Sequence, residues 1–376
     1  MSLGSPLLRY WYNPAPDSLG HTVEEFLQIL AGPALIHVPG RDRQRKRALC
    51  TLLHGNEPSG TRALFRWLQQ QPQPAVDLLC FIGSVHTALT EPPFFHRHLP
   101  GERDLNRCFR PPFEDRQGRL AKAILDILQE MEPESLIDIH NTSGMGPSFA
   151  VAMKQDPEHE ALASLFTERM LVTGLRLGAL FEYSERNVPT VTIECGGAQD
   201  PRADEIAYEG LLRYVDAAEV LKPFRADWQM EVLYEPVRLE LSEDAAITYS
   251  EAEDVYADIT LPPDVERHNF GRVAPDQPLG WVKPGSWDKL KITNPENYKE
   301  YVEKVTPLVE KFGGEFLVRA GEFQIFDGET KFPRIIILKF PSYEKALEWY
   351  NSEEYKPIKQ IRLDNSEGTN IIIKGI

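Results

Sequence analysis

The apolar residues of this chain fall into short runs, three of which are bounded by glycine-containing turn segments. These three runs occupy residues 48–53, 135–140 and 189–194. Apolar runs of this length between turn residues predict buried strands. Further strands are predicted at 34–38, 77–82 and 150–153, and apolar positions at helical spacing predict helices over 22–30, 60–70, 120–131, 157–171 and 204–221. This alternation predicts an α/β fold in which helices flank a sheet.

Each of the three runs brings a chemically capable side chain to the carboxyl end of its strand. The first run leads directly to His54, and the turn that follows folds Glu57 back toward the same point. The second run ends at His140 and the third at Glu194. Because open α/β sheets build their sites at the carboxyl ends of strands, we expect these four side chains to meet.

Two imidazoles and a carboxylate are a suitable ligand set for zinc. His54, Glu57 and His140 would leave one coordination position open for water, as catalytic zinc sites do. Glu194 is then the candidate proton shuttle that metal-assisted hydrolysis requires. A His-x-x-Glu segment alone is weak evidence, because a polar loop can carry the same residues. The alternative interpretation is therefore that these are unrelated polar residues at three strand ends.

Four motifs in order carry a family resemblance. Residues 54–60 (HGNEPSG), 104–109 (DLNRCF), 138–142 (DIHNT) and 193–196 (IECG) together resemble the succinylglutamate desuccinylase/aspartoacylase family. The resemblance runs from about residue 30 to about Trp281. It implies a zinc carboxypeptidase-like mixed sheet flanked by helices, followed by a small β-rich domain. It also implies one zinc ion per chain and hydrolysis of the amide bond of a small anionic N-acyl amino acid.

The resemblance also implies roles for residues around the zinc site. Glu194 is implied to transfer the proton, and Asn106 and Arg107 are implied to bind the substrate's carboxylate. A guanidinium suits that role because it forms two parallel hydrogen bonds with a carboxylate, although a surface salt bridge is the alternative for Arg107. The catalytic arginine that polarises the scissile carbonyl is implied at Arg97, with Arg103 left open. Substrate contacts are further implied for Asn141, Thr142 and Arg186.

The chain also departs from the family pattern. The family normally supplies a late tyrosine to the active site from a segment beyond the second domain, and no counterpart follows Trp281 here. The sequence therefore allows a second function class, a catalytically impaired fusion or chimera that acts as a binding or oligomerisation protein. Zinc content, measured together with hydrolysis of N-acyl amino acids, distinguishes the two.

Charge and composition narrow the range of partners. The formal net charge of −16 argues against nucleic acid or an anionic membrane as a partner. No apolar run approaches the roughly 18–20 residues of a transmembrane helix, and the first residues do not resemble a signal peptide. The four cysteines lack paired spacing and are predicted to be free thiols of a cytoplasmic protein. The basic run at 41–47 is predicted to be a solvated hairpin turn.

The composition changes near residues 284–286. Before residue 287 the chain has 22 arginines, 5 lysines and 9 histidines, whereas the remainder has 3 arginines, 11 lysines and no histidine. The change suggests different genomic origins, and a natural gene fusion and an engineered chimera both explain it. We predict three domains: a catalytic domain over 1–228, a β-rich second domain over 229–284, and a C-terminal domain over 287–376.

The C-terminal segment is predicted to be an α+β unit. Strands are expected at 315–319, 322–326, 333–340 and 369–374, and helices are expected from a cap at 294 through 311, after Ser342 and from Ser352. This order resembles an uncharacterised bacterial family with a ferredoxin-like, dimeric α+β barrel fold. Both faces of the 333–340 strand are apolar and need cover. We therefore expect a homodimer through residues 287–376.

Overall fold

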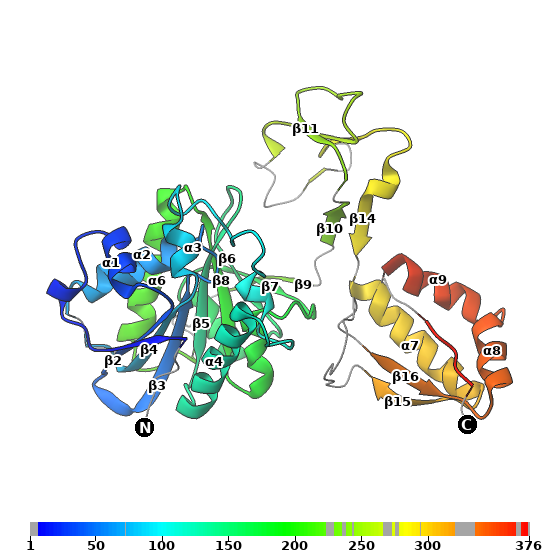
Figure 1. Ribbon diagram of the computed structural model, residues 1–376, viewed down its shortest axis with the longest axis horizontal. Coiled ribbons are helices and arrows are strands. Elements are labelled where there is room, and N and C mark those ends of the chain that lie inside the picture. Colours follow the sequence, from blue (N-terminus) through cyan, green and yellow to red (C-terminus); the bar gives the residue numbers. More distant parts are fainter. Residues whose placement is uncertain are drawn as a thin grey trace. The chain divides into compact units, whose positions relative to one another are not determined.

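The computed structural model divides the chain into two compact units, each with its own hydrophobic core (Figure 1). The described residues are 7–71, 73–222, 229–234, 238–242, 244–265, 273–274, 278–293, 295–319, 335–365 and 370–374. The first unit comprises Met1–Tyr234 with Leu261–Gly280, and the second comprises Glu235–Thr260 with Trp281–Ile376.

The first unit is built on a nine-stranded mixed sheet. Its strands are β1 (Arg9–Tyr12), β2 (Ala34–Val38), β3 (Asp42–Thr51), β4 (Val76–Ile82), β5 (Leu136–Thr142), β6 (Phe149–Ala152), β7 (Arg169–Val172), β8 (Thr190–Gly197) and β9 (Glu231–Tyr234). In space they follow the order β1-β2-β4-β3-β5-β8-β6-β7-β9. The central strands β4, β3, β5 and β8 run parallel, whereas β2 and β6 are antiparallel to β4 and β8. The predicted α/β fold with a mixed sheet is confirmed.

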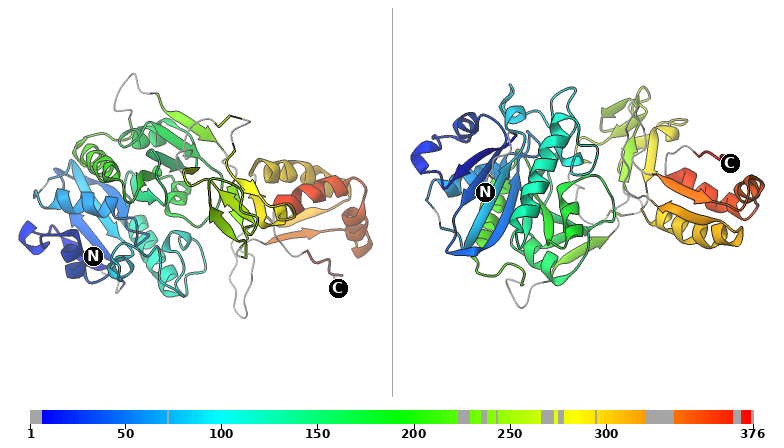
Figure 2. Two further views of the ribbon diagram at one scale, coloured as in Figure 1. Left: turned by 90° about the horizontal axis from the view of Figure 1, so that it is seen from above. Right: turned by 60° about the horizontal axis from the view of Figure 1, so that its bottom comes forward.

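Helices cover both faces of this sheet, as the views in Figure 1 and Figure 2 show. They are α1 (Val23–Leu30), α2 (Ser59–Leu68), α3 (Val85–Leu89), α4 (Arg116–Met131), α5 (Pro157–Ser164) and α6 (Pro201–Asp216). One core joins α1, α2 and α6 to one face, and a second core joins α4 to the other. Side chains of β5 alternate between the two, with Ile137 in the first core and Leu136 in the second. Because both faces are buried, the central strands are apolar along most of their length.

Within the described residues, no helix combines the length and the apolar character that crossing a bilayer requires.

One predicted helix is shorter in the structure. The helix expected over 157–171 ends at Ser164, and Arg169–Val172 forms strand β7 instead. In that strand Met170 and Val172 are buried, while the residues between and before them are less buried. This period of two belongs to a strand, and the helical interpretation missed it because the apolar residues are too few to fix a period.

The basic run at 41–47 is not a solvated hairpin turn. From Asp42 onward it forms the first half of β3, and the side chain of Arg47 is fully buried. The guanidinium of Arg47 donates to Glu134 and to the carbonyl oxygens of Tyr214, Ala217 and Ala218, over 2.6–3.0 Å. A buried charge is tolerated here because it is paired and hydrogen-bonded. These bonds tie the end of α6 to the central strands.

The second unit contains small sheets and three helices within its described residues. Its strands pair as β10 (Arg238–Leu241) with β14 (Leu290–Thr293), β12 (Ile259–Leu261) with β13 (Trp281–Val282), and β15 (Glu315–Arg319) with β16 (Ile336–Lys339). Strand β11 (Ile247–Tyr249) joins β12, and the helices are α7 (Pro295–Lys311), α8 (Tyr343–Asn351) and α9 (Tyr355–Asn365). Ser342 caps α8 as predicted, because its hydroxyl accepts a hydrogen bond from the backbone of Lys345.

The β15–β16 pair is covered on one face by a small core. In that core Trp349 stacks on Tyr355 with ring centroids 4.4 Å apart, and Leu338 of β16 packs against it. The side chains of Leu317 and Ile337, in the same two strands, are 55% and 45% exposed. An apolar part of this two-stranded sheet is therefore open.

Several predictions for the C-terminal unit lie wholly or partly outside the described residues. These are the cap at 294, the strand at 322–326 and the start of the strand at 333–340. Residues 370–374 are described and form no strand, although one was expected there. The ferredoxin-like arrangement of this unit stays a prediction.

Candidate active site

His54, Glu57 and His140 come together at the carboxyl edge of the central strands. His54 and Glu57 lie in the turn between β3 and α2, and His140 lies in β5. One ligand atom from each residue lies within 4.8 Å of the others, and all three side chains are buried. Glu57 lies between the rings, with Oε2 at 2.6 Å from Nδ1 of His140 and Oε1 at 2.9 Å from Nδ1 of His54. We refer to these three residues as the metal cluster.

A glycine allows the turn after β3 to close this tightly. A Cβ atom at Gly60 would lie 2.4 Å from Oγ1 of Thr51 and 2.8 Å from Cβ of Ile139. Side-chain atoms do not approach this closely, so the first turn of α2 can pack onto β3 and β5 only without a side chain here. This close packing brings Glu57 back over the strand ends.

The far ring nitrogen of each histidine is held by another carboxylate. Nε2 of His54 is 2.8 Å from Oδ1 of Asp104, and Nε2 of His140 is 2.7 Å from Oδ2 of Asp138. Such carboxylates fix the orientation of imidazole ligands. No role was predicted for either aspartate from the sequence. The contact of Asp138 could have been predicted, because residues two apart in a strand lie on the same face and Asp138 is two residues before His140. Asp104 is distant from His54 in the sequence, so no local pattern predicts their contact.

The charged groups of the cluster shift one another's pKa values. Burial opposes ionisation of Glu57, but His140 and His54 together hold its pKa well below the usual range. Burial also opposes a charged His140, yet Asp138 and Glu57 raise its pKa well above the usual value. A cation that binds here must therefore displace a proton from His140.

The donor atoms of the cluster fit a divalent cation. Nδ1 of His54 is buried and makes no hydrogen bond within the described part of the chain, although Oε1 of Glu57 lies 2.9 Å from it. Leaving a buried nitrogen without a well-formed hydrogen bond costs free energy, which binding a cation would recover. Two imidazole nitrogens and a carboxylate also match the ligands of three-residue zinc sites. The three residues form a candidate metal site.

Glu194 lies beside His140 because β5 and β8 are parallel and in register. The two residues are direct partners in the ladder and so project to the same face of the sheet. Oε2 of Glu194 is buried and has no hydrogen-bond partner among the residues that the structure describes. Burial, opposed by His140 and reinforced by Glu57, raises the pKa of Glu194 to about 7. A carboxyl group with this pKa can accept and release a proton near neutral pH.

Arg97 reaches the cluster and Arg103 does not. Nη1 of Arg97 is 3.0 Å from Oε1 of Glu57, and Nη2 is 2.7 Å from Nε2 of His54. Arg103 instead pairs with Asp115, the cap of α4. Of the two arginines that the sequence left open, the geometry favours Arg97.

Asn106 and Arg107 lie in a short helix, η2 (Leu105–Arg107), next to the cluster. Nδ2 of Asn106 is 3.3 Å from Nε2 of His140, and its Oδ1 accepts a hydrogen bond from the backbone of Leu180 at 2.9 Å. The side chain of Arg107 is exposed, and Nη1 donates to the carbonyl oxygen of Asn106 at 2.8 Å. Their binding of a substrate carboxylate stays a prediction.

Asn141 and Thr142 occupy the last positions of β5. Nδ2 of the Asn141 side chain donates to Oγ of Ser59 and to the carbonyl oxygen of Gly196, at 2.9 and 3.0 Å. Its Oδ1 accepts from the backbone of Ser59 at 3.1 Å. These bonds hold the start of α2 against β8. Thr142 donates to the carbonyl oxygen of Gly144 at 2.7 Å. The predicted substrate contacts of both residues stay predictions.

A known protein-family model matches the segment that contains the metal cluster. Residues 44–216 match the succinylglutamate desuccinylase/aspartoacylase catalytic domain. Residues 44–216 belong to that family. Residues 288–376 match a domain of unknown function, DUF1330. Both resemblances inferred from the sequence are thereby confirmed, the first of them over a shorter segment than expected.

Some solved structures are similar to part of this chain at low identity. The succinylglutamate desuccinylase from Chromobacterium violaceum is 15% identical, with a TM-score of 0.46, covering 58% of this chain and 74% of that chain. The succinylglutamate desuccinylase from Vibrio cholerae is 14% identical, with a TM-score of 0.45 and coverage of 64% and 74%. The ectoine utilization protein EutE (DoeB) from Ruegeria pomeroyi is 18% identical, with a TM-score of 0.43 and coverage of 69% and 82%. No curated protein matches the chain.

Within the desuccinylase/aspartoacylase domain, Arg186 is not brought to the metal cluster. It ends a short helix, η3 (Leu180–Arg186), before β8 begins, whereas Glu194 lies toward the carboxyl end of that strand. Nη1 of Arg186 donates to Gln129, near the end of α4, at 3.0 Å. The geometry therefore gives no support to its predicted substrate contact.

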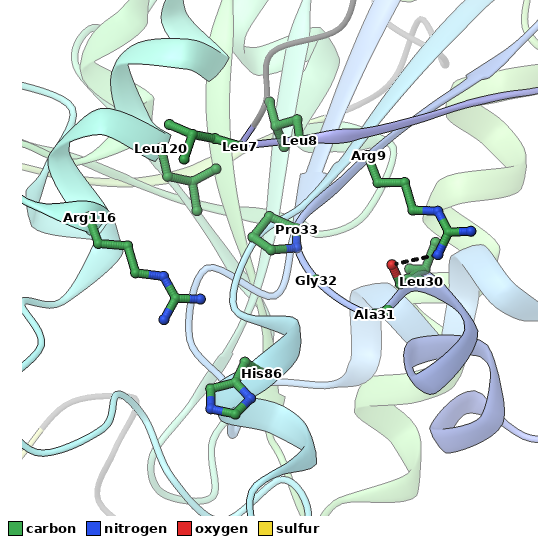
Figure 3. A pocket seen from close by; sticks show the side chains of 10 residues that line it. All are labelled: Leu7, Leu8, Arg9, Leu30, Ala31, Gly32, Pro33, His86, Arg116 and Leu120. Carbon is green, nitrogen blue, oxygen red and sulfur yellow. Dashed lines mark hydrogen bonds between the residues drawn. The ribbon is translucent and has the colours of Figure 1, made fainter.

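A separate cavity of about 580 Å³ lies elsewhere in the first unit (Figure 3). Its lining includes Arg9, His86 and Arg116 but none of the cluster residues. Arg9 donates to the carbonyl oxygen of Leu30, and Arg116 donates to Glu102. Among the described residues, the lining of this cavity has one histidine and no carboxylate or cysteine, so it is not a second candidate metal site.

Proposed function

We propose that the desuccinylase/aspartoacylase domain is a zinc-dependent hydrolase that cleaves the amide bond of an N-acyl amino acid. The observation that carries the proposal is the position of Glu194, in register beside His140, at the candidate metal site. His54, Glu57 and His140 would hold one zinc ion per chain. When bound, zinc polarises a carbonyl group and makes a bound water more acidic.

Glu194 is the proposed proton carrier of the reaction. As a carboxylate it accepts a proton from the attacking water, and it then returns that proton to the leaving amine nitrogen. A pKa of about 7 suits both steps, because the two protonation states differ little in free energy at neutral pH. Asp104 and Asp138 keep the two imidazoles oriented while the proton moves.

The nearby arginines are proposed to bind the negative charge of a small anionic substrate. Arg97 would donate to the amide oxygen, on which negative charge develops during attack. Arg107, with the amide of Asn106, would bind the substrate's carboxylate. Thr142, at the end of β5, is retained as a further candidate contact. The acyl group, for example acetyl or succinyl, is left open by this arrangement.

The proposal is tested by measuring zinc and hydrolysis on the same preparation. Metal content is determined by mass spectrometry, and release of the free amino acid is followed for N-acetyl and N-succinyl amino acids. We expect one zinc per chain and turnover of at least one such substrate. A chain with neither zinc nor turnover would instead be a binding or oligomerisation protein that retains the fold without the activity.

We also propose that the chain forms a homodimer through residues 287–376, the third of three domains at 1–228, 229–284 and 287–376. The supporting observation is the exposure of Leu317 and Ile337 in the β15–β16 pair. A second copy of the same surface would cover these side chains, as apolar strand faces require.

A further inference from the structure

Glu182 is a buried carboxylate that lies outside the metal cluster. It belongs to η3 and is only 6% exposed. Its Oε1 accepts hydrogen bonds from three consecutive backbone N–H groups, those of residues 177–179, at 2.6, 2.8 and 3.2 Å. Its Oε2 forms an ion pair with Arg110. Charge-assisted bonds of this kind are stronger than neutral ones, so Glu182 fixes the path of this loop.

The loop fixed by Glu182 packs directly against the turn that carries Asn106 and Arg107. The carbonyl oxygen of Gly178 accepts a hydrogen bond from the backbone of Phe109 at 2.9 Å. Gly178 has φ of +73°, and a Cβ atom there would lie 2.7 Å from the carbonyl oxygen of Arg107. No side chain fits between the two backbones, so the loop sets the position of the Arg107 backbone.

The same loop also orients the side chain of Asn106. The backbone N–H of Leu180 donates to Oδ1 of Asn106 at 2.9 Å, which fixes the amide plane. Nδ2 of that amide is consequently aimed at His140, at 3.3 Å. A shift of the loop would therefore move the Asn106 amide and the Arg107 backbone together.

We propose that Glu182 is a positioning residue for substrate recognition: it holds the 177–179 loop, and the loop holds Asn106 and Arg107 in the geometry that binds a substrate carboxylate. The inference about the loop rests on the contacts described above. The inference about the substrate rests on the proposed function, because it assigns the carboxylate to Arg107.

Glu182→Gln is the direct test, and Glu185→Gln is its matched control. Glu185 pairs with the same Arg110, at 2.8 Å, and with Arg176, at 2.7 Å, but it is exposed and makes no hydrogen bond to residues 177–179 in the part of the chain that the structure describes. In Glu182→Gln we expect unchanged zinc content, a rise in KM for N-acyl amino acids of roughly tenfold and a smaller change in kcat, the pattern of lost substrate binding. Glu185→Gln should match the unaltered chain.

Hydrogen exchange provides a readout that does not depend on activity. In Glu182→Gln, peptides covering residues 106–110 and 177–180 should both exchange faster, while a peptide covering His140 should not. If the unaltered chain hydrolyses no N-acyl amino acid, the proposed function fails, whereas coupled exchange of these two peptides would still establish the positioning of the loop. Unchanged exchange in both peptides overturns the inference, whatever the activity.

Gly178→Ala tests the same contact from the other side. The new Cβ would press on the carbonyl oxygen of Arg107, so KM should rise while zinc is retained. Gly285→Ala is the control, because Gly285 also has a positive φ, +94°, but a Cβ atom there meets nothing within 4 Å. Equal effects of the two substitutions on KM, or a loss confined to kcat, would overturn the assignment of the loop to substrate binding.

Discussion

The central strands of the first unit and the β15–β16 pair of the second are both rich in apolar residues, but they are covered differently. Strands β5 and β8 have helices on both faces, and the side chains along them are nearly all buried. In β16, Leu338 packs against a core, while Ile337 next to it remains 45% exposed. A strand with two apolar faces is complete within one chain only when both faces are covered. Among the described residues of the second unit, Ile337 and Leu317 therefore lack the cover that helices give both faces of β5 and β8.

The two regions also differ in where they place charge. In the first unit the ionisable groups at the strand ends are buried together, and their pKa values are shifted strongly. In the second unit, ion pairs such as Lys311 with Glu354 and Lys339 with Glu315 are largely exposed. Exposed pairs contribute little to stability, whereas clustered groups with perturbed pKa values mark functional sites. Chemistry is thus expected in the first unit and association in the second.

The largest expected effect is removal of a metal ligand. His54→Ala should abolish zinc binding and hydrolysis, because only two protein ligands would remain, while the fold should persist. Metal content and circular dichroism check both points. His86→Ala is the control, since His86 is exposed and outside the cluster. Full zinc occupancy in His54→Ala would contradict the assignment.

Glu194→Gln should keep zinc and lose most of the turnover. An amide cannot accept the proton, and removing a general base typically costs about 10²–10⁴-fold in rate. Single-turnover rates and metal content are measured on the same sample. Loss of zinc along with activity would show instead that Glu194 is a ligand.

Arg107→Lys should impair hydrolysis by roughly 10- to 100-fold in kcat/KM, because lysine keeps the charge but loses the planar pair of donors. Arg186→Lys is the matched control, because Arg186 binds Gln129 away from the cluster. If the two variants behave alike, the carboxylate is bound by another group.

Ile337→Lys should convert a dimer into a monomer and leave the hydrolysis rate per chain unchanged. A lysine on the open β16 face would bury an unpaired charge in the dimer. Light scattering at micromolar concentration measures the mass. Leu363→Lys, at an exposed position of α9, should remain dimeric. A monomeric unaltered chain would rule out the dimer.

The smallest expected effect is a fall of kcat/KM on the acid side of the pH profile. Glu194 must be ionised to accept a proton, so kcat/KM should fall as the pH drops through its pKa. That pKa is about 7 without a cation. A bound cation favours the ionised form, so the fall should lie at or below this pH. A profile that stays flat from pH 8 to below pH 5 would exclude Glu194 as the base.

Much of the first unit could be predicted because its signals are local. Apolar runs predicted the central strands, and the ends of three runs, with the turn after the first, pointed to His54, Glu57, His140 and Glu194. Contacts between residues far apart in the sequence leave no local pattern. Arg47 was predicted to be solvated because its hydrogen-bond partners, Glu134 and the end of α6, are far away in the sequence. Asp104 was passed over for the same reason. Strand β7 was missed because four residues carry too little periodicity.

The parallel register of β5 and β8 has a consequence for how this domain can change. Backbone hydrogen bonds between neighbouring strands set the spacing of His140 and Glu194, so the length of chain that connects them does not. That connecting chain includes β6, α5, β7 and the loop held by Glu182. Insertions, deletions or recombination within it can reshape this connecting chain without altering the spacing of His140 and Glu194. Under the proposed function, the domain can thus diversify the amino acid that it releases while it keeps one reaction.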